Sequence, residues 1–173
     1  MTGCNKLVNQ KEEYFRKCAQ GRIRSYLRDA KSKLTDNVIL HRIVEFFHNN
    51  LDAHRYFASY FDRNDRGSNR LCDIAGRFQC QGKYDAHSCL DAHHINPYDN
   101  AESRILFTTW NLDHVIERRT ILSSLESKLN VSCGDSCYQN YFDLLFTRHN
   151  LKLVHKSCHV IGPHKNCHIE HDH

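Results

Sequence analysis

The sequence predicts an α+β protein in which a helical region precedes a region of short strands and helices held together by metal. Three observations support this fold class. Apolar residues in the first third recur at helical spacing, residues 62–70 contain no apolar residue, and most of the 9 cysteines and 14 histidines follow that segment. We therefore predict a helical region over residues 1–62 and a second domain over residues 63–173.

Composition sets the broad class. The 173 residues are 40% hydrophobic and 25% charged, which is typical of a folded chain. The formal net charge of +4 permits a polyanionic partner without requiring one. No apolar stretch reaches membrane-spanning length and the N-terminus lacks a signal-peptide pattern, so we expect an intracellular protein with no membrane partner. The odd cysteine count argues against a complete disulfide framework.

The first predicted helix covers residues 11–33, and residues 1–10 show no period and are expected to form an arm. One apolar face supports the helix, made by Phe15, Ala19, Ile23, Tyr26, Leu27 and Ala30. Arg22, Arg24 and Arg28 give this stretch a basic side. We interpret it as a solvated surface; phosphate contact would require a groove nearby.

A second helix is expected after a cap at Thr35 or Asp36. The apolar residues between 38 and 61 are more than two isolated helices can bury. Either these helices pack on the following domain, or they pair with a second copy of the chain. The surplus of apolar side chains favours a homodimer through this region.

The second domain is expected to consist of short elements. Two of them are extended: a hairpin over 72–80 around Gly76, and a buried strand over 104–110. We also expect a turn at 95–100, a strand or turn at 112–117 and a helix from 118. A loop at 131–137 is then followed by a helix from Tyr138 that Asn150 ends. The last expected elements are an extended segment at 151–154, a turn or helix start at 158–159 and a polar tail at 167–173.

Four residues of this domain can provide a tetrahedral zinc site, which requires four Cys or His ligands. They are Cys80, Cys89, His93 and Cys158. Their spacing differs from paired C-x2-C ligands, so buried free thiols are the alternative interpretation. Cys133 and Cys137 are a rival pair with no adjoining third ligand.

The Asp113-His114 dipeptide, together with His159 after the extended segment 151–154, indicates hydrolytic chemistry. A carboxylate and an imidazole from Asp113 and His159 can hold Mg²⁺, while His114 accepts a proton from water. His164 is placed to hold a phosphate or the attacking water. These are the parts of a one-metal phosphodiester hydrolase of the HNH, or ββα-metal, kind.

Longer motifs add a family resemblance. The run from His93 to His114, the segments 144–146 and 150–155, Cys158-His159 and the stretch 22–28 resemble the caspase-activated DNase family, the nuclease subunit of the apoptotic DNA fragmentation factor. The resemblance implies an Mg²⁺-dependent endonuclease that cuts double-stranded DNA and leaves 5′-phosphate ends. It also implies a scissors-shaped homodimer that is nuclear when active and otherwise cytoplasmic.

The resemblance also assigns roles by position. Asp113 and His159 match the family's catalytic metal ligands and His114 matches its general base. His164 matches a further active-site histidine, and Lys11 aligns with an active-site lysine. The structural Zn²⁺ ligands of the family match the same four residues, Cys80, Cys89, His93 and Cys158.

Two departures from the family pattern affect regulation. The family's N-terminal CIDE domain, which binds an inhibitor-chaperone, has no counterpart here, and Glu170–His173 replaces its basic nuclear signal. Either the chain is an excised nuclease part or it is a relative that is regulated differently, so caspase-linked control and nuclear import by that tail do not follow from the resemblance. Two other functions compete with the nuclease: a zinc-stabilised DNA-binding module without catalysis, and an HNH-type nuclease that acts on RNA or single strands.

Overall fold

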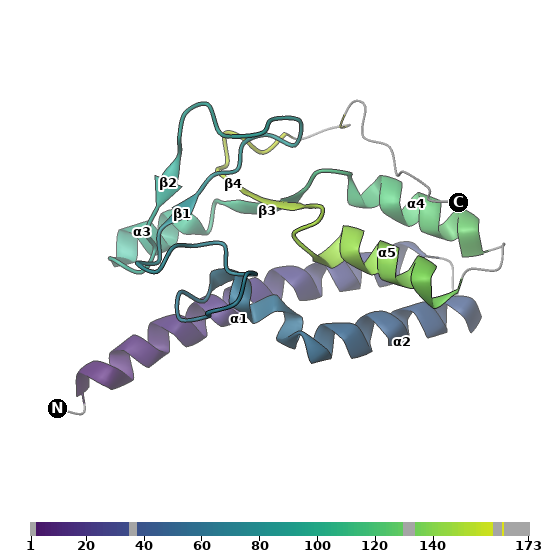
Figure 1. Ribbon diagram of the computed structural model, residues 1–173, viewed down its shortest axis with the longest axis horizontal. Coiled ribbons are helices and arrows are strands. Elements are labelled where there is room, and N and C mark those ends of the chain that lie inside the picture. The colour runs from purple at the N-terminus through teal and green to yellow at the C-terminus, as the bar shows by residue number, and fades with distance from the viewer. Residues whose placement is uncertain (1–2, 35–37, 130–133, 161–163, 165–173) are drawn as a thin grey trace.

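The computed structural model describes residues 3–34, 38–129, 134–160 and 164. Two long helices, α1 (Gly3–Lys33) and α2 (Val38–Ala53), form the base of the molecule (Figure 1). Two small antiparallel sheets and three shorter helices lie over this base. They are β1 (Phe78–Gln79), β2 (His94–Ile95), α3 (Ala101–Phe107), β3 (Asn111–His114), α4 (Arg118–Leu129), α5 (Asp135–Phe146) and β4 (Leu151–Val154).

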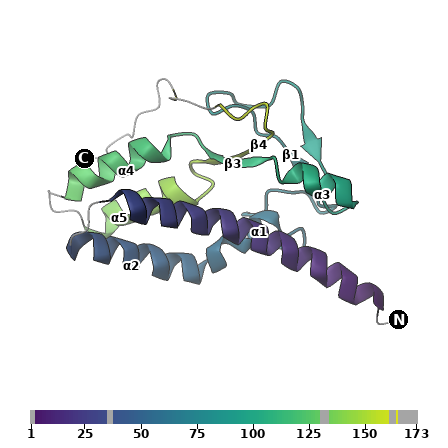
Figure 2. The same ribbon diagram turned by 180° about the vertical axis from the view of Figure 1, so that it is seen from behind.

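Helix α1 confirms the predicted apolar face and corrects the predicted arm. All six residues of that face are buried, because their three- and four-residue spacing turns them to one side of the helix. The helix begins at Gly3 rather than near residue 11, so residues 3–10 are not an irregular arm. Seen from behind, α1 crosses below β3, and the Tyr26 hydroxyl donates a hydrogen bond to the Leu112 carbonyl oxygen (Figure 2).

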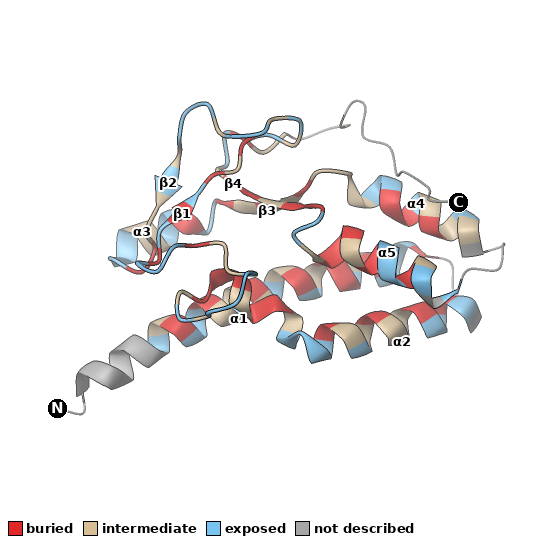
Figure 3. Cartoon of the chain, in the orientation of Figure 1, coloured by how far each residue is buried: buried red, intermediate tan, exposed pale blue. Residues whose placement is uncertain are grey.

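The surplus apolar residues of the second helical segment are buried within the chain. Phe47 of α2 packs against Phe142 and Phe146 of α5, with ring centroids 6.2 and 5.4 Å apart. The first of the two interpretations, packing on the following domain, is therefore confirmed for these side chains. Buried residues line the surfaces where α1, α2 and α5 face one another (Figure 3). The predicted cap residues Thr35 and Asp36 lie outside the described residues.

A tight reversal follows α2. The 3₁₀ segment η1 (Arg55–Phe61) starts with three consecutive non-glycine residues at positive φ, Arg55, Tyr56 and Phe57. This left-handed turn ends the helical pattern and brings Phe57 and Tyr60 back against the core, where the Tyr60 hydroxyl donates to the Phe146 carbonyl oxygen at 3.1 Å. Sequence periodicity extends through these residues, so it does not predict the turn.

The predicted hairpin around Gly76 is confirmed. Cys72 and Phe78 form an antiparallel bridge, and the Gly76 N–H donates to the Asp73 carbonyl oxygen across the turn. Gly76 has a φ of +87°, and a Cβ there would stand 2.5 Å from the Tyr98 ring, so glycine is required. Beyond the turn β1 pairs with β2.

The predicted buried strand over 104–110 is wrong. Residues 101–107 form helix α3, and Ile105 and Leu106 are exposed. Asn100 is the reason, because its side chain accepts a hydrogen bond from the Ser103 N–H at 2.7 Å and caps the helix. Only Phe107 and Trp110 of the apolar run enter the core.

The remaining elements follow the predictions more closely. Segment 112–117 forms part of β3 and a turn, α4 covers the predicted helix, and β4 is the extended segment. Helix α5 ends at Phe146, and not at Asn150 as predicted. A turn follows β4 at the predicted place. Cys133 and the 167–173 tail lie outside the described residues.

One apolar cluster runs through both predicted domains, from Phe15 in α1 to Val154 in β4. A charged contact also crosses the proposed boundary after residue 62, because Arg63 pairs with the buried Glu12 at 2.8 Å. Just before the boundary, Asp62 pairs with Arg16 at 2.9 Å. The division into residues 1–62 and 63–173 stays a prediction. Among the described helices, none is long and apolar enough to cross a bilayer.

Candidate active site

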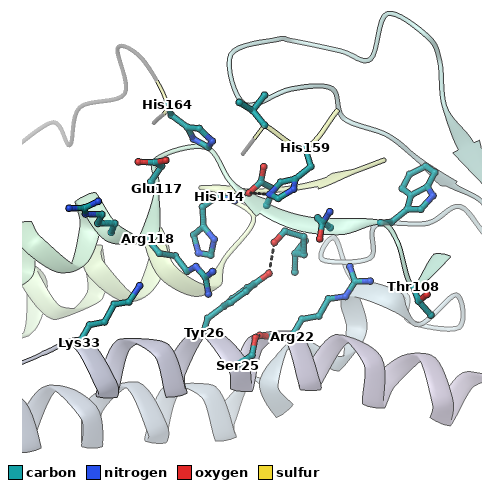
Figure 4. A pocket seen from close by; sticks show the side chains of 16 residues that line it. Arg22, Ser25, Tyr26, Lys33, Thr108, His114, Glu117, Arg118, His159 and His164 are labelled. Carbon is teal, nitrogen blue, oxygen red and sulfur yellow. Dashed lines mark hydrogen bonds and ion pairs between the residues drawn. The ribbon is translucent and has the colours of Figure 1, made fainter. Parts of the chain in front are cut away.

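A pocket of about 630 Å³ lies between α1, β3, the start of α4 and the segment that follows β4 (Figure 4). Asp113 and His114 reach it from β3, and His159 and His164 reach it from the end of the chain. Alternation along β3 separates the two neighbours: His114 turns towards the core, and Asp113 turns towards the pocket. The structure thus brings four of the predicted catalytic residues to one place.

Asp113 Oδ1 and His159 Nε2 lie 3.6 Å apart, and both side chains line the pocket. His159 is labelled in Figure 4. The same Oδ1 accepts the backbone N–H of His114 at 2.9 Å, which fixes the carboxylate orientation. Burial raises the pKa of Asp113, and the neighbouring His159 opposes that rise. A carboxylate oxygen and an imidazole nitrogen at this separation fit two ligands of one divalent cation, because bonds of about 2.1 Å place such ligands roughly 3 Å apart.

His114 is held in one orientation by the core. Its Nε2 lies 2.9 Å from the Leu145 carbonyl oxygen, and its ring meets the Tyr26 ring edge to face at 4.8 Å. A carbonyl oxygen only accepts, so Nε2 carries the proton and Nδ1 keeps a free lone pair. Burial lowers the pKa of His114 to about 3, so the ring is neutral at physiological pH. The arrangement suits a proton acceptor.

His164 is fixed by two contacts. Its Nδ1 lies 2.8 Å from the Val115 carbonyl oxygen, and its ring stacks on Tyr84 with centroids 3.9 Å apart. By the same argument Nδ1 donates to that carbonyl oxygen, which leaves Nε2 for other contacts. His164 lines the pocket, as its predicted role requires.

Lys11 is not brought to this pocket. Its Nζ donates to the Tyr98 carbonyl oxygen at 2.8 Å, and its side chain lines a different hollow, beside α3. The geometry of the chain therefore adds no support to a catalytic role for Lys11, which stays a prediction from the family resemblance.

The four predicted zinc ligands converge. The ligand atoms of Cys80, Cys89, His93 and Cys158 all lie within 4.8 Å of one another. Cys158 Sγ lies 3.7 Å from Cys89 Sγ and 3.6 Å from His93 Nδ1. In a tetrahedral site with Zn–S bonds of about 2.3 Å, ligand atoms stand roughly 3.8 Å apart. Three soft thiols and one imidazole at these distances fit Zn²⁺.

Backbone donors complete the second site. The N–H groups of Gly82 and His155 point at Cys80 Sγ, at 3.4 and 3.3 Å. Such donors stabilise a thiolate, which is the form that binds metal. Burial, followed by interactions with Cys80 and Cys89, raises the pKa of Cys158 to about 12, so this thiol ionises at neutral pH only beside a cation.

The sequence arguments missed the residues that support the site from α1 and α4. Tyr26 was predicted only as a core residue, yet its hydroxyl binds the β3 backbone and its ring positions His114. The Arg118 guanidinium lies over the Tyr26 ring at 4.8 Å and pairs with Asp29 at 3.5 Å. A signal was present for Tyr26, because a buried tyrosine hydroxyl needs a partner.

Together these features define a class: an α+β protein with a cysteine–histidine cluster beside a pocket whose carboxylate and imidazoles suit a divalent cation. The comparisons with known proteins agree with that class. The chain matches the DNA fragmentation factor 40 kDa family over residues 1–173, and it belongs to that family.

Named relatives support the assignment. The human DNA fragmentation factor subunit beta is 45% identical over 175 residues, which cover 95% of this chain and 51% of the relative. The mouse subunit beta is 41% identical over 94% of this chain and 49% of its own length. The chain thus spans about half the length of the curated relatives it matches. A crystal structure titled caspase-activated DNase superposes with a TM-score of 0.85 and 41% identity, over 93% of this chain and 67% of that one.

Proposed function

We propose that this chain is a metal-dependent endonuclease that hydrolyses double-stranded DNA in apoptotic-type DNA fragmentation. One observation carries the proposal: Asp113 and His159 stand 3.6 Å apart, beside a neutral His114 whose Nε2 is anchored. Family membership and the name of the similar solved structure support the same activity. A protein that only binds DNA has no use for an anchored base beside a cation site.

In this proposal His114 accepts a proton from the attacking water at Nδ1, because Nε2 is committed to the Leu145 carbonyl oxygen. A pKa of about 3 keeps the ring ready to accept but makes it a weak base when the pocket is empty. The negative charge of a bound phosphate raises the basicity of the ring, so proton transfer is tied to substrate binding.

Asp113 and His159 would hold the catalytic cation, for which we propose Mg²⁺. When bound, the cation supplies Lewis-acid polarisation of the phosphate and stabilises the departing 3′ oxygen. Two protein ligands leave most of the coordination shell to water and phosphate, which is the usual situation of protein-bound Mg²⁺. Because Nδ1 donates to the Val115 carbonyl oxygen, His164 acts through Nε2. Nε2 positions either the attacking water, by accepting its O–H, or a phosphate oxygen, to which Nε2 donates when it also carries a proton.

Zn²⁺ in the Cys80, Cys89, His93 and Cys158 cluster has a structural role in this proposal. Cys80 follows β1 and Cys158 follows β4, so one ion ties together segments that are 78 residues apart in the chain, from 80 to 158. The four ligands leave no open position for substrate. The ion would hold His159, the next residue after Cys158, in the active-site pocket.

We also propose a homodimer through the helical region, a nuclear or cytoplasmic location that is nuclear when the protein is active, and an inhibitor-chaperone as a partner, which the name of the relatives as a subunit supports. The homodimer now rests on the family resemblance, since the apolar surplus is buried within the chain. Light scattering of the 173-residue chain tests it, because the monomer mass of 20.4 kDa differs from that of a pair by a factor of two.

The decisive experiment is digestion of supercoiled plasmid DNA by zinc-loaded protein, with Mg²⁺ and with EDTA. We expect cleavage in Mg²⁺, none in EDTA, and 5′-phosphate ends. Parallel reactions with single-stranded DNA and with RNA decide between this function and the nuclease alternative. DNA binding without cleavage of any nucleic acid would support the catalytically inactive module instead.

A further inference from the structure

Two further hollows extend from the active-site pocket along α1. The second, of about 350 Å³, shares Arg22, Ser25 and Thr108 with the active-site pocket. The third, of about 470 Å³, shares Tyr14, Arg104 and Thr108 with the second. The three hollows therefore form one groove that leads from the pocket of Asp113 along α1 and past α3. Arg22, Ser25 and Thr108 can be followed in Figure 4 from α1 to the start of β3.

This groove outside the active-site pocket is basic and is lined in part by hydroxyl groups. The second hollow contains the guanidinium groups of Arg22 and Arg104, and the third adds the Lys11 ammonium group. Hydroxyls of Tyr14, Ser25 and Thr108 line the same stretch. No carboxylate lines either hollow in the described part of the chain. Positive charge and donors without acids are what a polyanion needs.

Each of the two guanidinium groups has an N–H group that makes no hydrogen bond within the described part of the protein. Nη1 of Arg22 and Nη1 of Arg104 are buried and have no hydrogen-bond partner among the described residues. Arg22 makes one long hydrogen bond, 3.5 Å from its Nη2 to the Phe107 carbonyl oxygen. Burial lowers the pKa of Arg22, because the charge is held away from water without a carboxylate to compensate it.

A purely structural role leaves this arrangement unexplained. Arg22 lies over the rings of Phe61 and Phe107, at 4.9 and 5.6 Å, and these contacts use the face of the guanidinium. They do not satisfy its N–H groups. Buried arginines in stable cores are usually paired, as Arg63 is with Glu12. Two arginines with unpaired N–H groups line one hollow, and a bound anion would supply the acceptors that these groups lack.

We propose that Arg22 and Arg104 form a phosphate subsite that binds the backbone of the substrate strand at a nucleotide flanking the scissile phosphate. This inference rests on the proposed function. Continuity with the active-site pocket favours a phosphodiester over a free carboxylate. Arginine forks bind phosphate oxygens through two parallel hydrogen bonds.

The test uses a fluorescent DNA duplex and the His114→Ala protein, which is expected to bind DNA without cutting it. Affinity is measured by anisotropy at several NaCl concentrations, because each phosphate contact contributes roughly 0.9 to the slope of log K against log salt. Arg104→Gln is expected to reduce that slope by roughly 0.9. Arg77→Gln is the matched control, since Arg77 is exposed on the hairpin and lines none of the three hollows. Its slope is expected to equal that of the parent.

A second variant distinguishes the loss of a phosphate contact from the loss of the folded structure. Arg22→Lys keeps the charge but loses the fork, so we expect weaker binding with a nearly unchanged slope and an unchanged circular dichroism spectrum. An Arg104→Gln slope equal to that of the parent would overturn the subsite while leaving the proposed function intact. If the parent does not bind DNA at all, the proposed function fails and the subsite fails with it.

Discussion

The clearest prediction about stability concerns Asn150, because its buried side chain makes three hydrogen bonds beside the active site. Its amide nitrogen donates to the carbonyl oxygens of Ile116 and Leu144, at 3.0 and 2.9 Å. Its amide oxygen accepts the Ile116 N–H at 2.7 Å. The residue is 2% exposed, so water cannot easily replace these partners.

Asn150→Ala is expected to lower the free energy of unfolding by about 3 kcal/mol, from about 1 kcal/mol for each of three hydrogen bonds. The partner groups that remain buried and unpaired add to this cost. Urea unfolding followed by circular dichroism measures the change, with the m-value expected to stay constant. Asn140→Ala is the control, because Asn140 is exposed on α5 and its loss should change stability by less than about 0.5 kcal/mol.

The same substitution should also reduce activity. Asn150 holds the turn after β3, and the Val115 carbonyl oxygen in that turn accepts the hydrogen bond of His164. We expect slower plasmid cleavage at a temperature where the variant is still folded. A variant as stable as the parent, within about 0.5 kcal/mol, would refute the hydrogen-bond argument.

Three more predictions concern the two candidate metal sites. His114→Ala should lower cleavage by about 10²–10⁴-fold while DNA binding persists, and full plasmid cleavage in Mg²⁺ would show that another group is the base. Cys80→Ser should release zinc, measured by mass spectrometry of metals, and lower the melting temperature, whereas Cys72→Ser should keep the zinc because that buried thiol lies outside the cluster. The pKa of His114 is lowered from 6.5 to about 3, so its contribution to stability is present above pH 6.5 and is lost as the pH falls towards 3. Between pH 7 and pH 5 this amounts to about 2 kcal/mol, and His114→Gln should remove that part of the acid sensitivity in urea unfolding.

Residue spacing predicted the secondary structure correctly where the structure of a segment depends on residues within that segment. The six-residue face of α1, the hairpin at Gly76 and the extended segment of β4 each depend on a period or a turn residue that lies within the segment itself. Pattern failed at residues 104–110. There an apolar run resembles a strand, but the cap at Asn100 starts a helix and leaves Ile105 exposed.

The candidate site divides in the same way. Residue type and order alone indicated that Asp113, His114 and His159 act together and that four Cys and His residues share an ion. Their spacing could not supply the distances, which arise because β3 pairs with β4 and the turn after β4 returns His159 to Asp113.

What the amino-acid order determined by itself is the set of chemical groups and the elements with strong local periods, since both are properties of short segments. The tertiary structure alone decided which nitrogen of His114 is free, that Lys11 lies outside the pocket, and that Arg22 and Arg104 share a groove without an acidic partner. These outcomes depend on contacts between residues dozens of positions apart. Such contacts are selected by the packing of the whole core, which no local pattern records.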